Sequence, residues 1–137
     1  PCLDEELLVR RIRRRTAPIK SVILDQSTLS GIGNIYADEG LWEARLHFAR
    51  PAIGISSRKV RELLRACRDV MQRALEVGGT SFDALYVNVD GRSGYFARSL
   101  KAYGKHGTPC PRCNRALVRA QFQNRSSHFC PYCQRLR

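Results

Sequence analysis

The most constraining feature of this 137-residue sequence is a pair of CxxC motifs near its C-terminus. Cys110 and Cys113 form the first motif and Cys130 and Cys133 the second, with 16 residues between them. Each motif places two thiolates on one tight turn, and two such turns together close a tetrahedral zinc site. Two disulfides are the alternative, but the sequence shows no secretion signal and its spacing matches a zinc ribbon. We therefore expect one structural Zn²⁺ with four protein ligands and no open position for catalysis.

The residues between the two motifs predict a two-stranded hairpin. Its strands are expected over residues 116–122 and 126–129, with Asn124 and Arg125 at the turn and Arg125 directed outward. His128 lies close to the predicted ligands. Because four thiolates already satisfy zinc, we interpret His128 as a histidine on the hairpin surface.

The charge of the chain predicts a polyanionic partner. Lys and Arg number 24 against 12 Asp and Glu, which gives a formal net charge of +12 and a pI near 10.1. The excess is concentrated at the C-terminal end, since ten basic and no acidic residues follow Asp90. A solubilising surface would mix the two signs, whereas a long stretch without acids favours phosphate binding. An anionic membrane would require an amphipathic helix or a lipid signal, which the basic tail lacks.

The residues before the zinc motif have mainly helical periodicity. Helices are expected over residues 3–15, 18–26 and 35–46, and the clearest one begins at Ser56 or Ser57 and ends at Gly78–Gly79. The apolar stripe of that last helix is predicted to be core, and it comprises Val60, Leu63, Leu64, Cys67, Val70, Met71, Ala74 and Leu75.

Several motifs along the chain together carry a family resemblance. They are Ile19-Lys20, Leu24-Asp25-Gln26, the stretch GIGNIYADE over residues 31–39, Gly78-Gly79-Thr80, Gly94-Tyr95-Phe96, Tyr103-Gly104 and the four-cysteine finger ending in Cys133-Gln134. In this order and spacing the sequence resembles the formamidopyrimidine-DNA glycosylase family, which includes endonuclease VIII. The resemblance implies a mainly α fold, with a helix-two-turn-helix domain over residues 1–97 and a zinc finger over residues 98–137.

The resemblance also implies a set of DNA-binding residues. The residues matching Asn34 and Arg125 bind phosphates that flank the damaged nucleotide, while Lys20 matches a lysine near the lesion pocket and Tyr103 a tyrosine on the phosphate side. Physical chemistry agrees for Asn34, because free backbone N–H groups at a helix start favour an anion, and Gly33 permits close approach of the backbone. Asn34 as a simple helix cap is the alternative. The guanidinium of Arg125 suits phosphate oxygens.

The sequence departs from the family at its start. Family enzymes carry a preceding β-rich catalytic domain that opens with proline and glutamate, whereas here Pro1 is followed by Cys2. We therefore expect a zinc-containing protein that binds duplex, damaged or abasic DNA without glycosylase activity. The alternative is a glycosylase or abasic-site lyase that uses the Pro1 amine or an exposed lysine such as Lys20 as Schiff-base nucleophile. A module that recruits other repair proteins is a third hypothesis.

The remaining expectations concern location and assembly. No apolar run approaches the roughly 20 residues that a membrane-spanning helix requires, and the first residues are acidic and then strongly basic. We expect a cytoplasmic, nucleoid-associated protein that acts as a monomer.

Overall fold

The computed structural model describes residues 2–25, 33–76, 100–123 and 125–136. Within these residues the elements are, in chain order, four α-helices, one short 3-10 helix and two strands: α1 (Cys2–Arg13), α2 (Ile19–Leu24), α3 (Asn34–Ala44), η1 (Ala52–Gly54), α4 (Ser57–Glu76), β1 (Val118–Phe122) and β2 (Arg125–Phe129). The mainly α fold with a small hairpin is confirmed. Two predictions fall outside the described residues and stay predictions: the domain boundary after residue 97 and the end of the last helix at Gly78–Gly79. Pro1 also lies outside the described residues.

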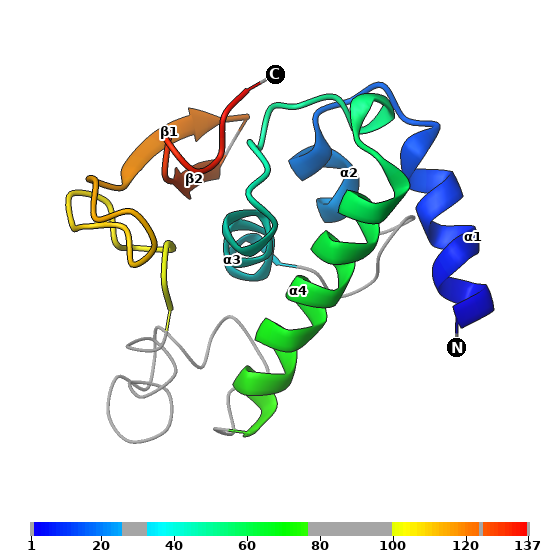
Figure 1. Cartoon of the computed structure of the whole chain (residues 1–137), viewed down its shortest axis with the longest axis horizontal. Coiled ribbons are helices and arrows are strands. Elements are labelled where there is room, and N and C mark those ends of the chain that lie inside the picture. The colour runs from blue at the N-terminus through cyan, green and yellow to red at the C-terminus, as the bar shows by residue number, and fades with distance from the viewer. Residues whose placement is uncertain (1, 26–32, 77–99, 124, 137) are drawn as a thin grey trace.

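Helix α3 occupies the centre of the fold. It packs against α4 on one side and against β2 and α2 on others, while α1 lies against the outer side of α4 (Figure 1). Nine of its eleven residues are buried, which exceeds what an ordinary amphipathic surface helix shows. A helix buried in this way must pair the charged side chains that it buries.

Helix α4 confirms the predicted apolar stripe over its described side chains. Val60, Leu63, Leu64, Cys67 and Val70 are buried, and Met71 is half-buried. The hydroxyl oxygen of Ser56 accepts a hydrogen bond from the backbone N–H of Lys59 at 3.2 Å. Ser56 therefore caps the helix, since this is the bond expected of an N-cap serine.

The hairpin shares its core with the helices. Strands β1 and β2 are antiparallel, with Phe122 opposite Arg125 and Val118 opposite Phe129. Phe122 and Phe129 belong to the same apolar cluster as the buried residues of α1 to α4. Both rings make edge-on contacts with Phe48, at centroid distances of 5.1 and 5.2 Å. The finger is thus docked on the helical part by apolar burial as well as by polar contacts.

The register corrects the predicted hairpin turn. Arg125 is the first residue of β2 and not part of the turn, because its pairing with Phe122 leaves only residues 123 and 124 between the strands. Gln123 has a φ of 54°, the left-handed conformation that two-residue hairpin turns commonly require. The structure otherwise agrees with the outward direction of Arg125, whose side chain is exposed.

The contact between α3 and α4 depends on Gly40. A Cβ atom built at Gly40 would lie 2.4 Å from the Sγ atom of Cys67 and 3.4 Å from its backbone nitrogen. Such distances leave no room for a methyl group without moving one helix. Gly40 therefore sets how closely helices α3 and α4 approach.

We predict that Gly40→Ala lowers the free energy of unfolding by about 1–3 kcal/mol, the usual cost of overpacking a core. Chemical denaturation would measure the loss. Gly54→Ala is the control, since no heavy atom of the described chain lies within 4 Å of a Cβ there. Adding Cys67→Ala to Gly40→Ala should recover part of the loss, because the clashing sulfur is removed. Equal stability of Gly40→Ala and the natural chain would contradict this account.

Candidate metal centre and nucleic-acid interface

The four predicted cysteines form one cluster. The Sγ atoms of Cys110, Cys113, Cys130 and Cys133 all lie within 4.8 Å of one another, and none of these cysteines is in a disulfide. Tetrahedral zinc with sulfur at about 2.3 Å needs sulfur atoms separated by about 3.8 Å, so the donor set fits this metal. The disulfide alternative is not what the structure contains. The cluster is a site for one structural zinc ion.

Helix α3 supports the first zinc knuckle through Trp42. The indole N–H of Trp42 donates to the Cys110 sulfur at 3.4 Å. The Arg112 guanidinium lies 3.9 Å over the Trp42 ring and donates to its carbonyl oxygen at 2.9 Å. Burial opposes ionisation of Cys110, but hydrogen bonds from the backbone of Cys113 and Arg112 and from Trp42 outweigh it and lower the pKa of the thiol to about 6. These contacts therefore favour the thiolate form of Cys110, the form in which a cysteine binds zinc.

The second knuckle is attached to the segment after α3 by a buried glutamine. The Gln134 carbonyl oxygen accepts from the backbone N–H of Cys130 at 2.9 Å, while its amide nitrogen donates to the Leu46 carbonyl at 3.0 Å. Both zinc-binding turns are thus fixed to the C-terminal half of α3 or the residues just after it.

A buried charged network joins the other half of α3 to the hairpin. The Lys20 ammonium is 0% exposed and lies 2.7 Å from a carboxylate oxygen of Asp38. It also donates to the Ser126 carbonyl at 3.0 Å and to the Ser127 hydroxyl at 2.8 Å. Desolvation lowers the pKa of Lys20, the Asp38 carboxylate opposes that shift, and the charge of Arg125 adds to it. Lys20 is therefore a buried tie between α2, α3 and β2.

This network corrects two expectations. Lys20 is not an exposed lysine amine, because burial and ion pairing enclose its ammonium. His128 is not a surface histidine either, since only 6% of it is exposed. The Asp38 carboxylate accepts from the His128 backbone at 3.0 Å and lies 3.1 Å from its ring Nδ1. A buried helix carrying Asp38 must compensate this carboxylate, and β2 supplies one of the partners.

Asn34 lies beside Arg125 at the start of α3. Its amide nitrogen donates to the Ser126 carbonyl at 3.1 Å, the same oxygen that Lys20 contacts, and Ser126 follows Arg125 directly. Gly33 is the N-cap residue, and no side chain caps the helix. Asn34 lies in the first turn of α3 and is only 8% exposed. Its hydrogen bond to Ser126 connects the helix to the hairpin. The simple cap interpretation of Asn34 does not describe this contact.

Gly33 has ordinary backbone geometry. Its φ and ψ of −98° and 174° are extended, so no left-handed conformation requires glycine here. Among the described residues, a Cβ built at position 33 would meet only the Tyr36 ring, at an ordinary 3.9 Å. The part of the chain that the structure describes therefore gives no steric reason for glycine at this position.

Tyr103 lies in the segment that leads to the finger and packs on the apolar cluster that contains Ile35, the second residue of α3. Its ring packs edge-on against His128 at a centroid distance of 4.6 Å. Its backbone N–H, together with those of Lys101 and Ala102, donates to the buried Glu39 carboxylate at 2.7 to 2.8 Å. Glu39 therefore anchors this segment to α3. The sequence analysis assigned no role to Asp38 and Glu39, although two adjacent acids beside the apolar residues of this helix were a usable signal.

Comparison with known proteins places these features in a family. Residues 2–85 match the model of the formamidopyrimidine-DNA glycosylase H2TH domain, where H2TH denotes helix-two-turn-helix, and residues 107–136 match the zinc finger found in FPG and IleRS. The chain belongs to the formamidopyrimidine-DNA glycosylase family. The resemblance seen in the sequence is thereby confirmed.

The chain corresponds to under half of its curated relatives. It is 58% identical to a formamidopyrimidine-DNA glycosylase of a Nocardioides species and 57% identical to one of Leifsonia xyli. These matches cover 98% and 99% of this chain but 45% and 46% of the relatives. Among solved structures, MutM in complex with DNA containing carbocyclic 8-oxo-G has a TM-score of 0.83 at 32% identity. The match covers 96% of this chain and 46% of the MutM chain. The MutM protein of Thermus thermophilus has a TM-score of 0.79 at 36% identity, and this match covers 95% of the present chain and 49% of the Thermus protein.

We predict that the purified chain binds one zinc ion and that chelation removes the hairpin while much of the helical signal persists. Zinc content by mass spectrometry, far-ultraviolet circular dichroism and resolved amide resonances of β1 and β2 would measure this. Cys113→Ser should lose the metal, because three thiolates and a hydroxyl hold zinc less well. Cys67→Ala is the control: Cys67 is buried in α4 away from the cluster, so it should retain one zinc. A hairpin that persists without metal would contradict the prediction.

Proposed function

We propose that this chain is a DNA-binding module that grips the phosphates of duplex DNA through the paired tips of α3 and the hairpin. The supporting observation is that one carbonyl, that of Ser126, holds Asn34 at the start of α3 beside the exposed cation Arg125. The first turn of a helix leaves backbone N–H groups without intrahelical acceptors and carries a partial positive charge. Together the two tips form a site suited to a phosphate backbone.

Gly33 and Lys20 support this assignment from two directions. Packing within the described chain gives no reason for a glycine at position 33, because a Cβ there would have space. Close approach of a phosphate backbone would give such a reason. The buried charge of Lys20 lies close enough to Arg125 for their repulsion to contribute to the lowered pKa of Lys20. Asp38 balances the charge of Lys20, so Lys20 supports the site by holding the Ser126 carbonyl, while the exposed guanidinium of Arg125 supplies the positive charge that favours a polyanion.

The relatives suggest which DNA is bound. Solved neighbours include MutM with DNA containing carbocyclic 8-oxo-G and the Lactococcus lactis enzyme with DNA containing an abasic site. We infer that this chain binds duplex DNA as a monomer, with abasic or otherwise damaged duplexes and other repair proteins as further partners. A location at the nucleoid in the cytoplasm follows from the same proposal. None of the helices in the described residues is long and apolar enough to cross a membrane.

The proposal assigns DNA binding, without base excision, to this chain alone. Lys20 is an unfavourable Schiff-base nucleophile, because its ammonium is enclosed and donates to Asp38, Ser126 and Ser127. Expulsion of a base would need a nucleophile with access to the sugar. Pro1 lies outside the described residues.

We predict that Arg125→Ala weakens duplex binding and lowers the slope of log K against log salt by about 0.9, the value for one lost phosphate contact. Fluorescence anisotropy over a series of salt concentrations would measure it. Arg10→Ala is the matched control, because Arg10 is an exposed arginine on α1, whereas Arg125 lies at the hairpin tip. An Arg125→Ala variant with the slope of the natural chain would remove Arg125 from the interface.

We predict that borohydride traps no covalent adduct between this chain and a duplex with one abasic site, although binding persists in the same samples. An attacking primary amine would form an imine with the sugar aldehyde, and the secondary amine of a proline would form an iminium ion, each with loss of water; borohydride would reduce either one to a stable amine. Intact-mass spectrometry followed by peptide mapping would detect and locate the link. An adduct at the Pro1 amine would overturn the proposal that the chain lacks lyase chemistry.

A further inference from the structure

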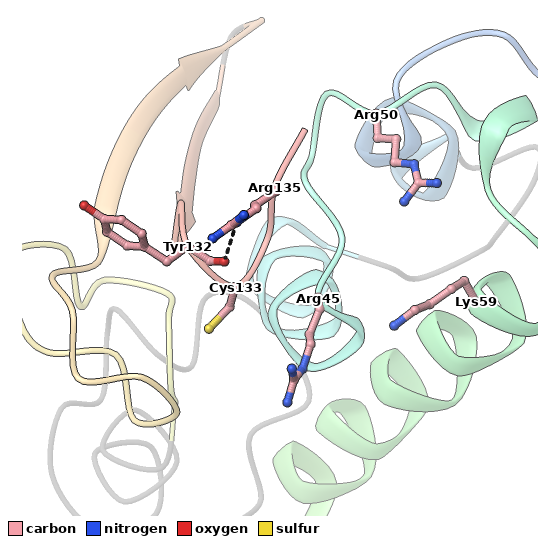
Figure 2. A pocket seen from close by; sticks show the side chains of 6 residues that line it. All are labelled: Arg45, Arg50, Lys59, Tyr132, Cys133 and Arg135. Atoms are coloured by element: carbon pink, nitrogen blue, oxygen red, sulfur yellow. Dashed lines mark hydrogen bonds between the residues drawn. The ribbon is translucent and has the colours of Figure 1, made fainter. Parts of the chain in front are cut away.

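The opposite end of α3 from Asn34 carries a second cationic feature. A cavity of about 380 Å³ lies between the last turn of α3, the start of α4 and the second zinc knuckle (Figure 2). Its lining consists of Arg45, Arg50, Lys59, Tyr132, Cys133 and Arg135. Four of these six side chains are cations and none is a carboxylate. The volume lies at the lower end of the range of roughly 300–1,000 Å³ found for small-ligand sites.

The arginines of this cavity are not used up by internal ion pairs. Within the described residues, no salt bridge joins Arg45, Arg50 or Arg135 to a carboxylate, whereas Arg15, Arg61 and Lys101, among others, have one. Arg50 donates to the Gly54 carbonyl at 3.1 Å and Arg135 to the Tyr132 carbonyl at 3.2 Å. A guanidinium has five N–H donors, so each retains capacity for a ligand. Lys59 has less capacity left for a ligand, since its ammonium donates to the Ala44 carbonyl at 2.8 Å and lies 3.5 Å from the Glu62 carboxylate.

The backbone of Arg45 gives an independent indication. Arg45 follows the last residue of α3 with φ 59° and ψ 39°, the left-handed conformation in which helices usually place glycine. Keeping an arginine there costs conformational energy, and residues held in this way are concentrated at functional sites. The helix dipole accounts for one cation at this end. It does not account for four cations around one cavity.

The neighbouring metal does not neutralise the cavity. Zinc with four thiolates has a formal charge of about −2, and Cys133 is the ligand that borders the cavity. Lys59 already pairs with Glu62, so two of the three arginines would balance that charge, and Arg112 contributes from the other knuckle. A positive excess therefore remains for a ligand.

We propose that this cavity is a second anion site, specific for phosphoryl groups, and distinct from the DNA contact at Asn34. An α3 of eleven residues is about 16 Å long, so the two sites lie at opposite ends of one rigid element. Guanidinium groups bind phosphate oxygens in bidentate pairs, and three of them border the cavity. The ligand is a small polyphosphate or a phosphate of a DNA strand outside the contact at Asn34. The proposal does not rest on the proposed function, because the site is defined without DNA.

The test measures binding of inorganic pyrophosphate to the zinc-loaded chain by isothermal titration calorimetry. The pocket variant is Arg45→Gly with Arg50→Gln, and the control is Arg10→Gln with Arg11→Gln, which removes two exposed charges from α1. We expect about tenfold weaker binding in the pocket variant and a change below twofold in the control. Equal affinity of the pocket variant and the natural chain, or an equal loss in the control, would overturn the proposal.

Two further measurements keep a structural role apart from ligand binding. Arg45→Gly relieves the left-handed strain, so its melting temperature should not fall, whereas a residue needed only for folding would lower it. If the double variant nevertheless fails to fold, Arg135→Gln, an exposed position, should give the same loss of pyrophosphate affinity. An unchanged affinity in Arg135→Gln would then overturn the proposal.

A duplex titration identifies the source of the phosphoryl group. If a DNA strand enters the cavity, the pocket variant lowers the salt slope of duplex binding by about 0.9 for each phosphate lost. If only free polyphosphate enters, the slope stays that of the natural chain while pyrophosphate binding is lost. Either outcome supports the site. Tighter binding of an oligoaspartate than of pyrophosphate would overturn its phosphoryl specificity.

Discussion

The buried carboxylate of Asp38 is the interaction on which the arrangement of the finger depends. A carboxylate inside a helix that is buried on nearly all sides carries a large desolvation penalty unless it is paired. Asp38 meets that requirement with the Lys20 ammonium from α2 and with the backbone and ring of His128 from β2. Removing one partner of such a pair typically costs about 3–5 kcal/mol. Electrostatics thus brings β2, which is distant in sequence, to the point where α2 and α3 meet.

The same helix holds the finger along its whole length. Asn34 and Asp38 contact β2, Glu39 binds the backbone of the segment before the finger, and Trp42 contacts the first zinc knuckle. Gln134 continues this series to the carbonyl of Leu46, just beyond the helix. These contacts place a glycine-led helix start beside Arg125 at one end and a group of arginines at the other. The geometry of both anion sites therefore follows from one rigid element.

Local patterns were sufficient for some of these features and insufficient for others. The CxxC spacing predicted the zinc cluster, and the periodicity of α4 predicted its buried face, because ligand geometry and helical repeat are properties of short segments. The burial of Lys20 and His128 was not predictable in that way. Each is polar, and each is buried beside the Asp38 carboxylate, which belongs to a different element of the fold. The predicted position of the hairpin turn was wrong by one residue, because the pairing of Phe122 with Arg125 sets the register and the composition of the turn does not reveal it.

Zinc alone would not fix the position of Arg125. The metal joins the two knuckles at the base of the hairpin, whereas Arg125 begins β2 beside the turn at the other end. A two-stranded hairpin is marginally stable by itself, so a tip held only from its base would fray. The contacts of Ser126 and Ser127 with Lys20 and Asn34 supply the second anchor, one residue from Arg125. An arginine that binds one particular phosphate needs both attachments, the zinc site and the contacts of Ser126 and Ser127. A flexible cation would still be attracted to DNA, but it would not be held in position at one phosphate.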